Sequence, residues 1–316
     1  MLYLSQRTLE SLPLTIDEVM GSIEHLLRMR SQGRMWNAPK AVIQPPDGRY
    51  MMATLAAADD PPFLAVKSLI LNPRNRDRGL ADINGIVTLL DSVTGLPLAL
   101  IDGNWVTAVR TAGLSAVAAK RLARPSASTA AFVGCGVQAR SHLRVLATLF
   151  PLKEIRAFGR GSPNRDALCQ TAETMGLTAV ASPTAREAVA DADLVITSVT
   201  FTPDLTPFLD ARWLKPGVFA TVTDLAAPWR PDGMRAFDRI VIDDVEQEAQ
   251  MPKPLVDPAL VAGDLTGLVN GAVAGRRSDD ERTAFVFRGL ALGDLALAAL
   301  AYQRASQLGK GAPVVE

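Results

Sequence analysis

The chain has 316 residues, enough for two domains of about 150 residues each. Its 33 lysines and arginines balance 33 aspartates and glutamates, so it lacks the basic excess that nucleic-acid or acidic-membrane surfaces require of a partner. Hydrophobic residues make up 48% and charged residues 21%, which excludes disorder for most of the chain and predicts a globular protein with a sizeable core.

The cysteines and histidines are too few for a disulfide framework or a zinc site. There are two of each (Cys135, Cys169, His25 and His142), and no Cys-x-x-Cys motif occurs. The first residues lack the charged head and apolar run of a signal peptide. The most apolar stretch, 289–302, is shorter than the roughly 20 residues that span a bilayer. We therefore expect a cytoplasmic protein without a bound metal and without a membrane or nucleic-acid partner.

The N-terminal third is predicted to form a helix, a meander of strands and a second helix. Thr15 followed by Glu18 predicts the N-cap of a helix that ends before Gly33. An alanine-rich helix is expected over 107–123. Between them, apolar runs separated by Gly, Pro, Asn and Asp predict strands and tight turns. The strands are expected over 41–43, 50–55, 64–71, 85–90 and 97–102, with turns at 47–48, 94–95 and 102–103.

From residue 128 onward, short apolar strands alternate with amphipathic helices. This alternation predicts an α/β fold, in which a doubly wound parallel sheet is covered by helices on both faces. A last apolar helix over 288–307 is expected to return to the N-terminal region. The strands are expected over 129–133, 155–158, 178–180, 194–198, 218–223 and 240–243, with helices ending at 149 and lying over 163–175 and 183–190.

A glycine-rich loop follows the first of these strands. Its sequence, Gly134-Cys135-Gly136-Val137-Gln138-Ala139, is the Gly-x-Gly-x-x-Ala form of the dinucleotide fingerprint. The first glycine allows a tight turn, the second lets a pyrophosphate approach the backbone, and the small third residue packs the helix on the strand. The free N–H groups at the helix start favour the anion. We therefore expect Gly134, Gly136, Val137 and Gln138 to bind the cofactor.

The next strand, over 155–158, ends at basic rather than acidic residues. NAD sites normally have an Asp or Glu here for the ribose hydroxyls, whereas this chain has Arg160, Ser162 and Arg165. A guanidinium and a hydroxyl would bind a 2′-phosphate that an acid would repel. The sequence therefore favours NADP(H) over NAD(H). The alternative is that Ser162 only caps the helix and that both arginines are solvated.

Further motifs, in the expected order over about residues 1–305, resemble those of the ornithine cyclodeaminase/mu-crystallin family. They are Val66-Lys67, Asn72-Pro73-Arg74-Asn75, Thr94-Gly95-Leu96-Pro97, Thr107-x-x-Arg110-Thr111-Ala112, Leu122-Ala123-Arg124, the glycine loop, and Gly289-Leu290-Ala291 with Asp294. The resemblance implies a homodimer. It also implies a Rossmann dinucleotide-binding domain over 123–289, and an α+β substrate-binding and dimerisation domain built from 1–122 and 290–316.

The resemblance also assigns roles to cationic side chains. Lys67 and Arg110 match the family's substrate-binding lysine and arginine. Cations of this kind orient the carboxylate of an amino or imino acid, and Arg110 can grip it bidentately while also approaching the cofactor pyrophosphate. Lys40, after Pro39, stands where the family has its first substrate-binding basic residue, and a lysine there can also transfer protons. The remaining expected cofactor contacts are Thr111, Ser198, Val199 and Thr200.

In the family, the catalytic aspartate follows a Trp-x-Lys-x-Gly segment and a Rossmann strand. Here the segment 213–217 and the strand 218–223 lead to Asp224, but the family's Asp-x-Pro-Gly-Lys-x-Glu tail is replaced by Asp-Leu-Ala-Ala-Pro-Trp-Arg-Pro. A carboxylate at the carboxyl end of a parallel strand is well placed for acid–base work. Asp224 is therefore the expected catalytic residue, with Lys67 and Lys40 as further candidates. The alternative is an aspartate that caps the next loop.

These observations predict an NAD(P)H-dependent oxidoreductase that acts on a small α-amino, α-imino or α-keto acid, such as a cyclic ketimine reductase or an alanine dehydrogenase. One alternative is ornithine cyclodeaminase, an ammonia lyase that uses NAD catalytically. Another is a non-catalytic ligand-binding protein similar to mu-crystallin. The apolar face of the last helix predicts the subunit contact of a homodimer. Its members are Leu290, Leu292, Leu295, Leu297 and Leu300.

Overall fold

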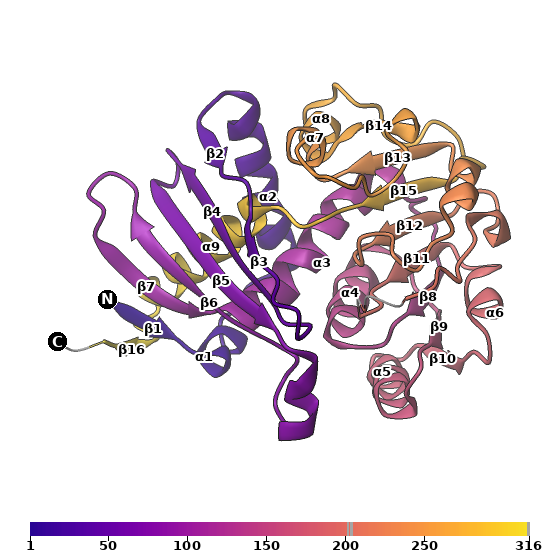
Figure 1. Ribbon diagram of the computed structural model, residues 1–316, viewed down its shortest axis with the longest axis horizontal. Coiled ribbons are helices and arrows are strands. Elements are labelled where there is room, and N and C mark those ends of the chain that lie inside the picture. The colour runs from indigo at the N-terminus through magenta and orange to yellow at the C-terminus, as the bar shows by residue number, and fades with distance from the viewer. Residues whose placement is uncertain (201, 203–204, 315–316) are drawn as a thin grey trace. The chain divides into compact units, whose positions relative to one another are not determined.

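The structure is a computed structural model that describes residues 1–200, 202 and 205–314, except for the side chain of Arg76. The chain divides into two compact units, which are described one at a time (Figure 1). Unit 1 consists of Met1–Gly113 and Ala291–Glu316, and unit 2 of Leu114–Leu290. The boundary lies inside helix α3, which runs over Gly103–Leu122.

Unit 1 is built on a mainly antiparallel sheet of eight strands. Its order is β16-β1-β7-β6-β5-β4-β2, with β3 also paired to β4, and only the β1–β7 pair is parallel. All five strands expected for this region are present, and β3 and β7 have the predicted bounds. The strands are β1 (Leu2–Leu4), β2 (Met35–Asn37), β3 (Ala41–Ile43), β4 (Tyr50–Ala58), β5 (Phe63–Leu71), β6 (Ile83–Asp91), β7 (Pro97–Asp102) and β16 (Ala312–Pro313).

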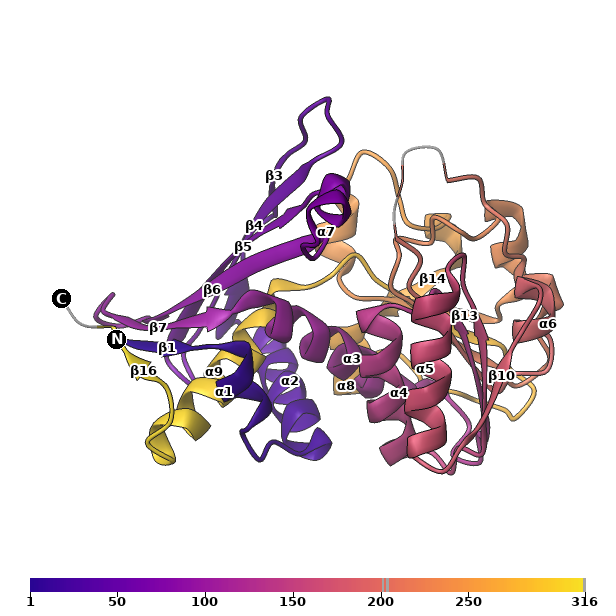
Figure 2. The ribbon, with the colours of Figure 1, turned by 90° about the horizontal axis from the view of Figure 1, so that it is seen from below.

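Two long helices, α2 (Ile16–Ser31) and α9 (Ala291–Gln307), pack against each other and lie along one face of this sheet (Figure 2). The predicted capping box starts α2: the Thr15 hydroxyl accepts from Glu18 N at 3.2 Å, and the Glu18 carboxylate accepts from Thr15 N at 2.8 Å. The short helices α1 (Gln6–Glu10) and η1 (Pro73–Arg78) complete the unit. Helix α9 packs on β4, β5 and β6, which encloses the core of unit 1 between helix and sheet.

The apolar face of α9 is not available to a partner subunit. Leu292, Leu295 and Leu297 are at most 1% exposed, because the helix packs on its own sheet and on α2. The expectation that these leucines form the subunit contact is therefore wrong. Large apolar side chains are exposed on the sheet instead, among them Trp36, Ile43, Leu55 and Ile70.

A second expectation that fails is the tight turn at Asp102-Gly103. Helix α3 begins there, and the Asp102 carboxylate accepts a hydrogen bond from Trp105 N at 2.7 Å, as a helix-capping aspartate does. Asp-Gly therefore marks a strand-to-helix junction rather than a hairpin. The glycine is needed for close packing, since a Cβ on Gly103 would lie 2.5 Å from the carbonyl carbon of Gly85 on β6.

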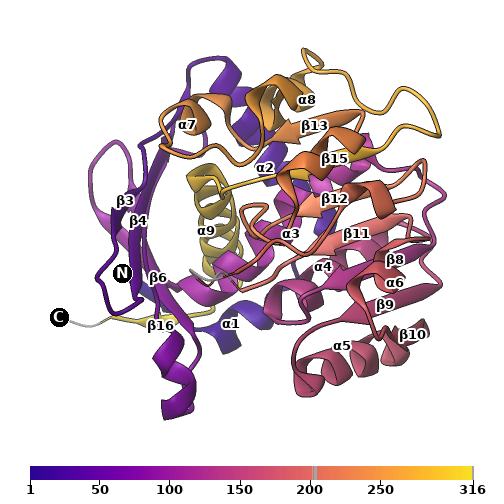
Figure 3. The same ribbon diagram turned by 45° about the vertical axis from the view of Figure 1, so that its right-hand side comes forward.

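Unit 2 contains the predicted doubly wound parallel sheet. Its eight strands are all parallel, in the order β10-β9-β8-β11-β12-β15-β13-β14 (Figure 3). Strands β14 and β15 were not predicted from the sequence, although β15 lies inside the sheet and all four of its residues are buried. The strands are β8 (Thr129–Val133), β9 (Glu154–Phe158), β10 (Thr178–Ala181), β11 (Leu194–Thr197), β12 (Phe219–Val222), β13 (Arg239–Ile242), β14 (Val261–Asp264) and β15 (Thr283–Val286).

Helices cover the sheet of unit 2 as the alternation predicts. Helices α4 (Val137–Leu149) and α5 (Ser162–Thr174) lie side by side in Figure 2. Helix α6 (Ala185–Val189) shares a different core layer with Ala131 and Val133 of β8. Among the described residues, no helix combines the length and apolarity needed to cross a membrane. The remaining short helices are α7 (Val245–Ala249), α8 (Leu265–Asn270), η2 (Ala211–Trp213), η3 (Pro231–Ala236) and η4 (Pro258–Leu260).

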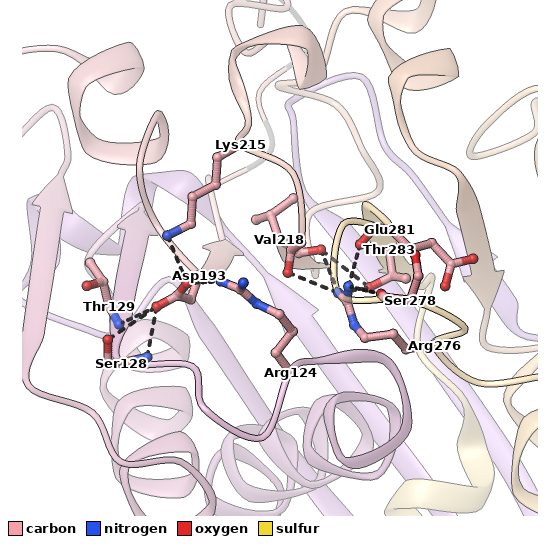
Figure 4. Close-up of polar contacts among 11 residues, drawn as sticks. Arg124, Ser128, Thr129, Asp193, Lys215, Val218, Arg276, Ser278, Glu281 and Thr283 are labelled. Atoms are coloured by element: carbon pink, nitrogen blue, oxygen red, sulfur yellow. Dashed lines mark hydrogen bonds and ion pairs between the residues drawn. The ribbon is translucent and has the colours of Figure 1, made fainter.

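Charged side chains tie together the amino ends of the central strands of unit 2 (Figure 4). The Asp193 carboxylate, just before β11, lies 2.6 Å from Arg124 Nη2 and 2.8 Å from Lys215 Nζ. It also accepts from the backbone N–H groups of Ser128 and Thr129 at the start of β8. This cluster fixes the edge of the sheet that is opposite to the carboxyl ends of its strands.

Arg276 forms a second part of the same edge (Figure 4). Its guanidinium donates to the carbonyl oxygens of Leu122 at 2.7 Å, Gly217 at 3.1 Å and Val218 at 3.0 Å, and to the Thr283 hydroxyl at 3.1 Å. These partners precede or begin β12 and β15 or end α3. One arginine thus satisfies three backbone carbonyls, at the end of α3 and before β12, and bonds a hydroxyl at the start of β15, which leaves the amino edge closed by the protein's own contacts.

Candidate functional site

The carboxyl edge of the unit 2 sheet holds the predicted cofactor residues. The chain runs from β8 outward through β9 and β10, and then resumes on the other side of β8 with β11. In open parallel sheets, ligands bind at such a switch point, beyond the carboxyl ends of the strands. The glycine loop follows β8, and Ser198, Val199 and Thr200 follow β11, so both segments lie at this point.

The glycine loop has the geometry that each glycine was expected to provide. Gly134 has a φ of +89°, and a Cβ there would lie 2.5 Å from the Ser198 carbonyl oxygen, so only glycine fits. Its carbonyl accepts a hydrogen bond from the Ser198 hydroxyl at 3.2 Å. Gly136 is the N-cap of α4 and makes no side-chain cap, and a Cβ there would meet no atom within 4 Å. There is therefore space beside Gly136, at the N-terminus of α4, where a pyrophosphate would be favoured.

The side chains beside these glycines differ in exposure. Val137 is 57% exposed and Gln138 is half-buried, both in the first turn of α4. Cys135 is buried, with its Sγ 3.4 Å from the Phe158 carbonyl oxygen. Burial raises the pKa of this thiol to about 11, so it stays protonated and unreactive near neutral pH. The loop therefore offers a backbone cradle rather than a nucleophile.

The end of β9 contains the residues that bear on cofactor choice. The N-cap of α5 is Gly161, without a side-chain cap, and Ser162 is the first helical residue, so the alternative in which Ser162 only caps the helix is wrong. Arg165 is turned toward Asp166, with its Nε and Nη2 both 3.1 Å from Asp166 Oδ1. Arg160 is exposed and makes no hydrogen bond or ion pair to any described residue. Arg160 and Ser162 are thus the groups available to a ligand.

In unit 1, Lys67 and Arg110 meet at one buried carboxylate. Asp294, in the first turn of α9, lies with its Oδ1 2.6 Å from Lys67 Nζ and 3.1 Å from Arg110 Nε. Its Oδ2 accepts a hydrogen bond from the Thr54 hydroxyl at 3.1 Å. Lys67 on β5 and Thr54 on β4 are register partners whose side chains both face α9. The two predicted substrate-binding cations are therefore brought together, by a residue from the other end of the chain.

The electrostatics of this cluster favour one more anion. Burial lowers the pKa of Lys67 to about 8, with Arg110 acting in the same direction and Asp294 against it. Burial alone would raise the pKa of Asp294, but Lys67 and Arg110 hold it below the usual value. Two cations and one carboxylate leave a net positive charge in a buried place, where a further negative group is strongly stabilised.

Arg110 has two buried nitrogens that make no hydrogen bond to a described residue: Nε, which forms only the ion pair with Asp294, and Nη1. The side chain is 8% exposed, and its Nη1 is buried without a hydrogen-bond partner in the described part of the chain. Buried guanidinium N–H groups are paired in nearly all folded proteins, so a buried donor without a partner calls for an acceptor that binds there. The neighbouring Thr111 is also buried on α3.

Lys40 lies close to this cluster in the sheet register. It is half-buried and directly precedes β3. Asn37 pairs with Ala56 and Ala41 pairs with Ala53, so the segment 38–40 runs beside the part of β4 that contains Thr54. The structure therefore places Lys40 at the same level of the sheet as Lys67.

Asp224 follows β12 at the carboxyl edge of the unit 2 sheet and is 6% exposed. Its Oδ1 accepts from the Thr197 hydroxyl at 3.0 Å, and its Oδ2 accepts from Val199 N at 3.0 Å. Burial raises the pKa of this carboxyl to about 7, although both hydrogen bonds act in the opposite direction. A carboxyl that titrates near neutral pH suits general acid–base catalysis.

Asp294 belongs to a sequence motif from which no role was predicted for it, and Thr54 carries no sequence signal that points to this site. The signal was a single acidic residue in the apolar first turn of a helix, where burial requires a cationic partner. His142 is fully buried, with Nε2 2.8 Å from the Ser115 hydroxyl, and burial lowers its pKa to about 4. No group of three or more metal-ligating side chains occurs among the described residues.

The sequence from residue 3 to residue 309 matches the profile of the ornithine cyclodeaminase/mu-crystallin family. The chain belongs to this family. The resemblance drawn from its motifs is thereby confirmed. Among curated relatives, alanine dehydrogenase of Archaeoglobus fulgidus is 29% identical, over 99% of this chain and 98% of that protein.

Solved structures of the family have the same fold. The Δ1-pyrroline-2-carboxylate reductase of Thermococcus litoralis, solved with NADH and L-proline, matches with a TM-score of 0.91 and 27% identity, over 99% of this chain and 100% of that one. An archaeal alanine dehydrogenase dimer with bound NAD matches with a TM-score of 0.87 and 27% identity, over 99% and 98% of the two chains. These matches confirm the expected α/β fold class.

Proposed function

We propose that this protein is a nicotinamide-dependent oxidoreductase that interconverts a small α-imino acid, or an α-keto acid with ammonia, and the corresponding α-amino acid. The observation that carries the proposal is the buried, unsatisfied Nη1 of Arg110 beside Lys67, in a cluster with a net positive charge. Relatives that act on alanine and on pyrroline-2-carboxylate support it, because both substrates carry a carboxylate next to the reacting carbon.

In this proposal the cations bind and orient the substrate. Arg110 donates from Nη1 to the substrate carboxylate, and Lys67 supplies a second charge-assisted contact. Lys40 adds a third cation at the same level of the sheet. Holding a planar carboxylate at fixed donors orients the adjacent carbon for transfer, which lowers the entropic part of the barrier.

Asp224 is the proposed acid–base group. With a pKa raised to about 7, its carboxyl can hold a proton near neutral pH and give it to an imine nitrogen, or take one from an amine in the reverse direction. Protonation makes the imine carbon a better acceptor. The nicotinamide supplies or accepts the hydride when it is bound.

The proposed cofactor residues are those of the carboxyl edge of unit 2: Gly134, Gly136, Val137, Gln138, Arg160, Ser162, Ser198, Val199 and Thr200. The open N-terminus of α4 and the space at Gly136 support a bound dinucleotide. We further propose that NADPH is preferred, because Arg160 is unpaired and Ser162 is exposed at the start of α5, with no acid at the end of β9. The solved relatives named above hold NADH and NAD, so this preference would distinguish the chain from them.

A steady-state assay tests the function. The purified protein should oxidise NADPH in the presence of pyrroline-2-carboxylate, or of pyruvate with ammonia. Asp224→Asn keeps the shape of the side chain and removes its titration, so kcat should fall by about 10²- to 10⁴-fold. Cofactor affinity should hardly change. Full kcat in this variant would refute the assignment of Asp224, and release of ammonia from ornithine with NAD would show the lyase reaction instead.

Cofactor preference is tested by one charge reversal. Arg160→Asp replaces a phosphate-binding cation with a repelling anion, so the ratio of the NADPH and NADH dissociation constants should narrow or reverse, by about tenfold or more. Arg165→Asp is the matched control, since Arg165 is already engaged by Asp166 and should matter less. Tighter binding of NADH than of NADPH to the unmodified protein would refute the preference.

We propose that the chain forms a homodimer, as the solved archaeal alanine dehydrogenase does. The outer face of the unit 1 sheet supports it, because Ile43, Leu55 and Ile70 are exposed there beside an apolar groove of about 440 Å³ on β3–β6. Sedimentation at micromolar concentration should give twice the mass of one chain.

We also propose a cytoplasmic location, which the unpaired cysteines at 135 and 169 support.

A further inference from the structure

A directed chain of hydrogen bonds ends on the Asp224 carboxyl. The indole Nε1 of Trp229 donates to the Thr197 hydroxyl oxygen at 3.2 Å, and that hydroxyl lies 3.0 Å from Asp224 Oδ1. All three side chains are buried: Thr197 is 0% and Trp229 is 2% exposed. Thr197 is the last residue of β11, Asp224 follows β12, and Trp229 lies in the segment after Asp224.

The donor direction in this chain is fixed by chemistry. An indole N–H can only donate, so Trp229 occupies an acceptor position of Thr197. The single hydroxyl proton of Thr197 is then directed to Asp224 Oδ1, and Val199 N donates to Oδ2. Both carboxyl oxygens already accept one donor on the side of β11. As long as both bonds are kept, a proton carried by Asp224 sits on a lone pair that neither of them occupies.

The backbone directly after Asp224 is strained, so contacts from the surrounding structure must hold it in place. Leu225 and Ala226, directly after it, have φ values of +59° and +55°, a left-handed backbone conformation that is unfavourable for residues other than glycine. Strain of this kind persists only where surrounding contacts enforce it. Trp229 provides such contacts, because its backbone bridges Leu209 and its ring packs 5.9 Å from that of Phe237.

We propose that Thr197 and Trp229 are positioning residues that fix the orientation of the Asp224 carboxyl and the side on which it exchanges its proton. The inference rests on the proposed function of Asp224. It also gives a role to the segment in which this chain departs from the family's Asp-x-Pro-Gly-Lys-x-Glu pattern, since Trp229 belongs to the replacement.

The groups that act on Asp224 are few. They are the Thr197 hydroxyl and backbone N–H groups, and no ion pair joins Asp224 to a described residue of unit 2. Burial raises the pKa of Asp224, and the Thr197 hydroxyl lowers it by stabilising the carboxylate. Removal of that hydroxyl should therefore raise the pKa further.

The experiment measures the pKa of Asp224 by NMR titration of protein labelled with ¹³C at the aspartate carboxyl. The Asp224 signal is identified by its absence from the Asp224→Asn variant. Thr197→Val removes the hydroxyl at nearly equal volume and should raise the pKa of Asp224 by about one unit. Thr197→Ser should restore it. Trp229→Phe replaces the indole with a smaller ring that has no N–H and should give a smaller rise.

Thr221→Val is the matched control. Thr221 is a buried threonine on the neighbouring strand β12, and its hydroxyl bonds Ser115 at 2.8 Å rather than Asp224. It should leave the Asp224 titration unchanged. In assays, Thr197→Val and Trp229→Phe should shift the pH profile of kcat in step with the titration, with little effect on KM.

The outcomes separate the two proposals. If Thr197→Val leaves the Asp224 titration unmoved, or Thr221→Val moves it equally, the positioning role is refuted while the catalytic role of Asp224 can stand. If the titration shifts as expected but Asp224→Asn retains full kcat, the positioning role is upheld and the proposed catalytic function fails.

Discussion

Two clusters in this protein have the same composition, one aspartate with one lysine and one arginine. Asp193 meets Arg124 and Lys215 at the amino edge of unit 2, and Asp294 meets Lys67 and Arg110 in unit 1. In each, the lysine Nζ lies within 2.8 Å of a carboxylate oxygen. Residue types and distances alone would not tell one from the other.

They differ in exposure. The side chains of Arg124 and Lys215 are 26% and 30% exposed, so water can reach their charges. The side chain of Lys67 is 0% exposed and that of Arg110 is 8% exposed. Water stabilises an excess positive charge at the surface, whereas the same charge in the interior destabilises the folded state. The buried cluster is therefore the one that gains by binding an anion, and the exposed one is a structural clamp.

The largest expected effect comes from removing each carboxylate. Asp294→Asn leaves Lys67 and Arg110 buried without a counter-charge, so the free energy of unfolding should fall by about 3–5 kcal/mol. Asp193→Asn leaves cations that water can solvate, and the loss should be about 1–3 kcal/mol. Urea unfolding followed by circular dichroism measures both. Equal losses would show that the difference in burial has no energetic consequence.

The two lysines should differ in activity. Lys67→Met removes the proposed contact to the substrate carboxylate and should lower kcat/KM by about 10- to 100-fold. Lys215→Met is its matched control and should stay within about twofold. Because the pKa of Lys67 is about 8, KM of the unmodified protein should rise above that pH as the charge is lost. A similar loss in both variants would mean that Lys67 has no special role in binding.

The smallest effect concerns stability in acid. Burial alone would raise the pKa of Asp193, but Lys215 and the N–H groups of Ser128 and Thr129 hold it at about 2, below its ordinary 3.8. Because the folded-state pKa is the lower one, the stabilisation is complete above about pH 4 and is lost as the pH falls toward 2. In that pH range the free energy of unfolding should therefore fall by about 1–2 kcal/mol less in Asp193→Asn than in the unmodified protein. An unchanged slope would contradict the assignment.

Much of the fold follows from local patterns. The Thr15–Glu18 capping box and the strands 97–102 and 129–133 are present at the predicted residues, because caps and apolar runs act over a few residues. Strand β15 was missed since its four residues are held by strands β12 and β13, which are distant in sequence. The Asp102-Gly103 pair was misassigned for the same reason. Gly103 has to be a glycine because Gly85 packs too close for a Cβ, and the local sequence does not reveal that contact.

The site divides in the same way. The glycine loop was predictable because one contiguous motif contains its function, whereas the Lys67–Asp294 pair joins residues 227 positions apart. A resemblance could give Lys67 and Arg110 their roles, but not the carboxylate that holds them. The directed bonds from Trp229 through Thr197 depend on the turn after β12, where this chain leaves the family's pattern.

Because Asp294 is carried by α9, the order of synthesis bears on how the protein folds. Unit 2 is one continuous segment, 114–290, so all of its strands have been made before α9 emerges. Unit 1 begins earlier on the ribosome but lacks the helix that covers β4, β5 and β6 until residues 291–307 emerge. Residues 1–113 are therefore made before unit 2 but can complete their core only after it has been made, and until then Lys67 and Arg110 lack the carboxylate of Asp294.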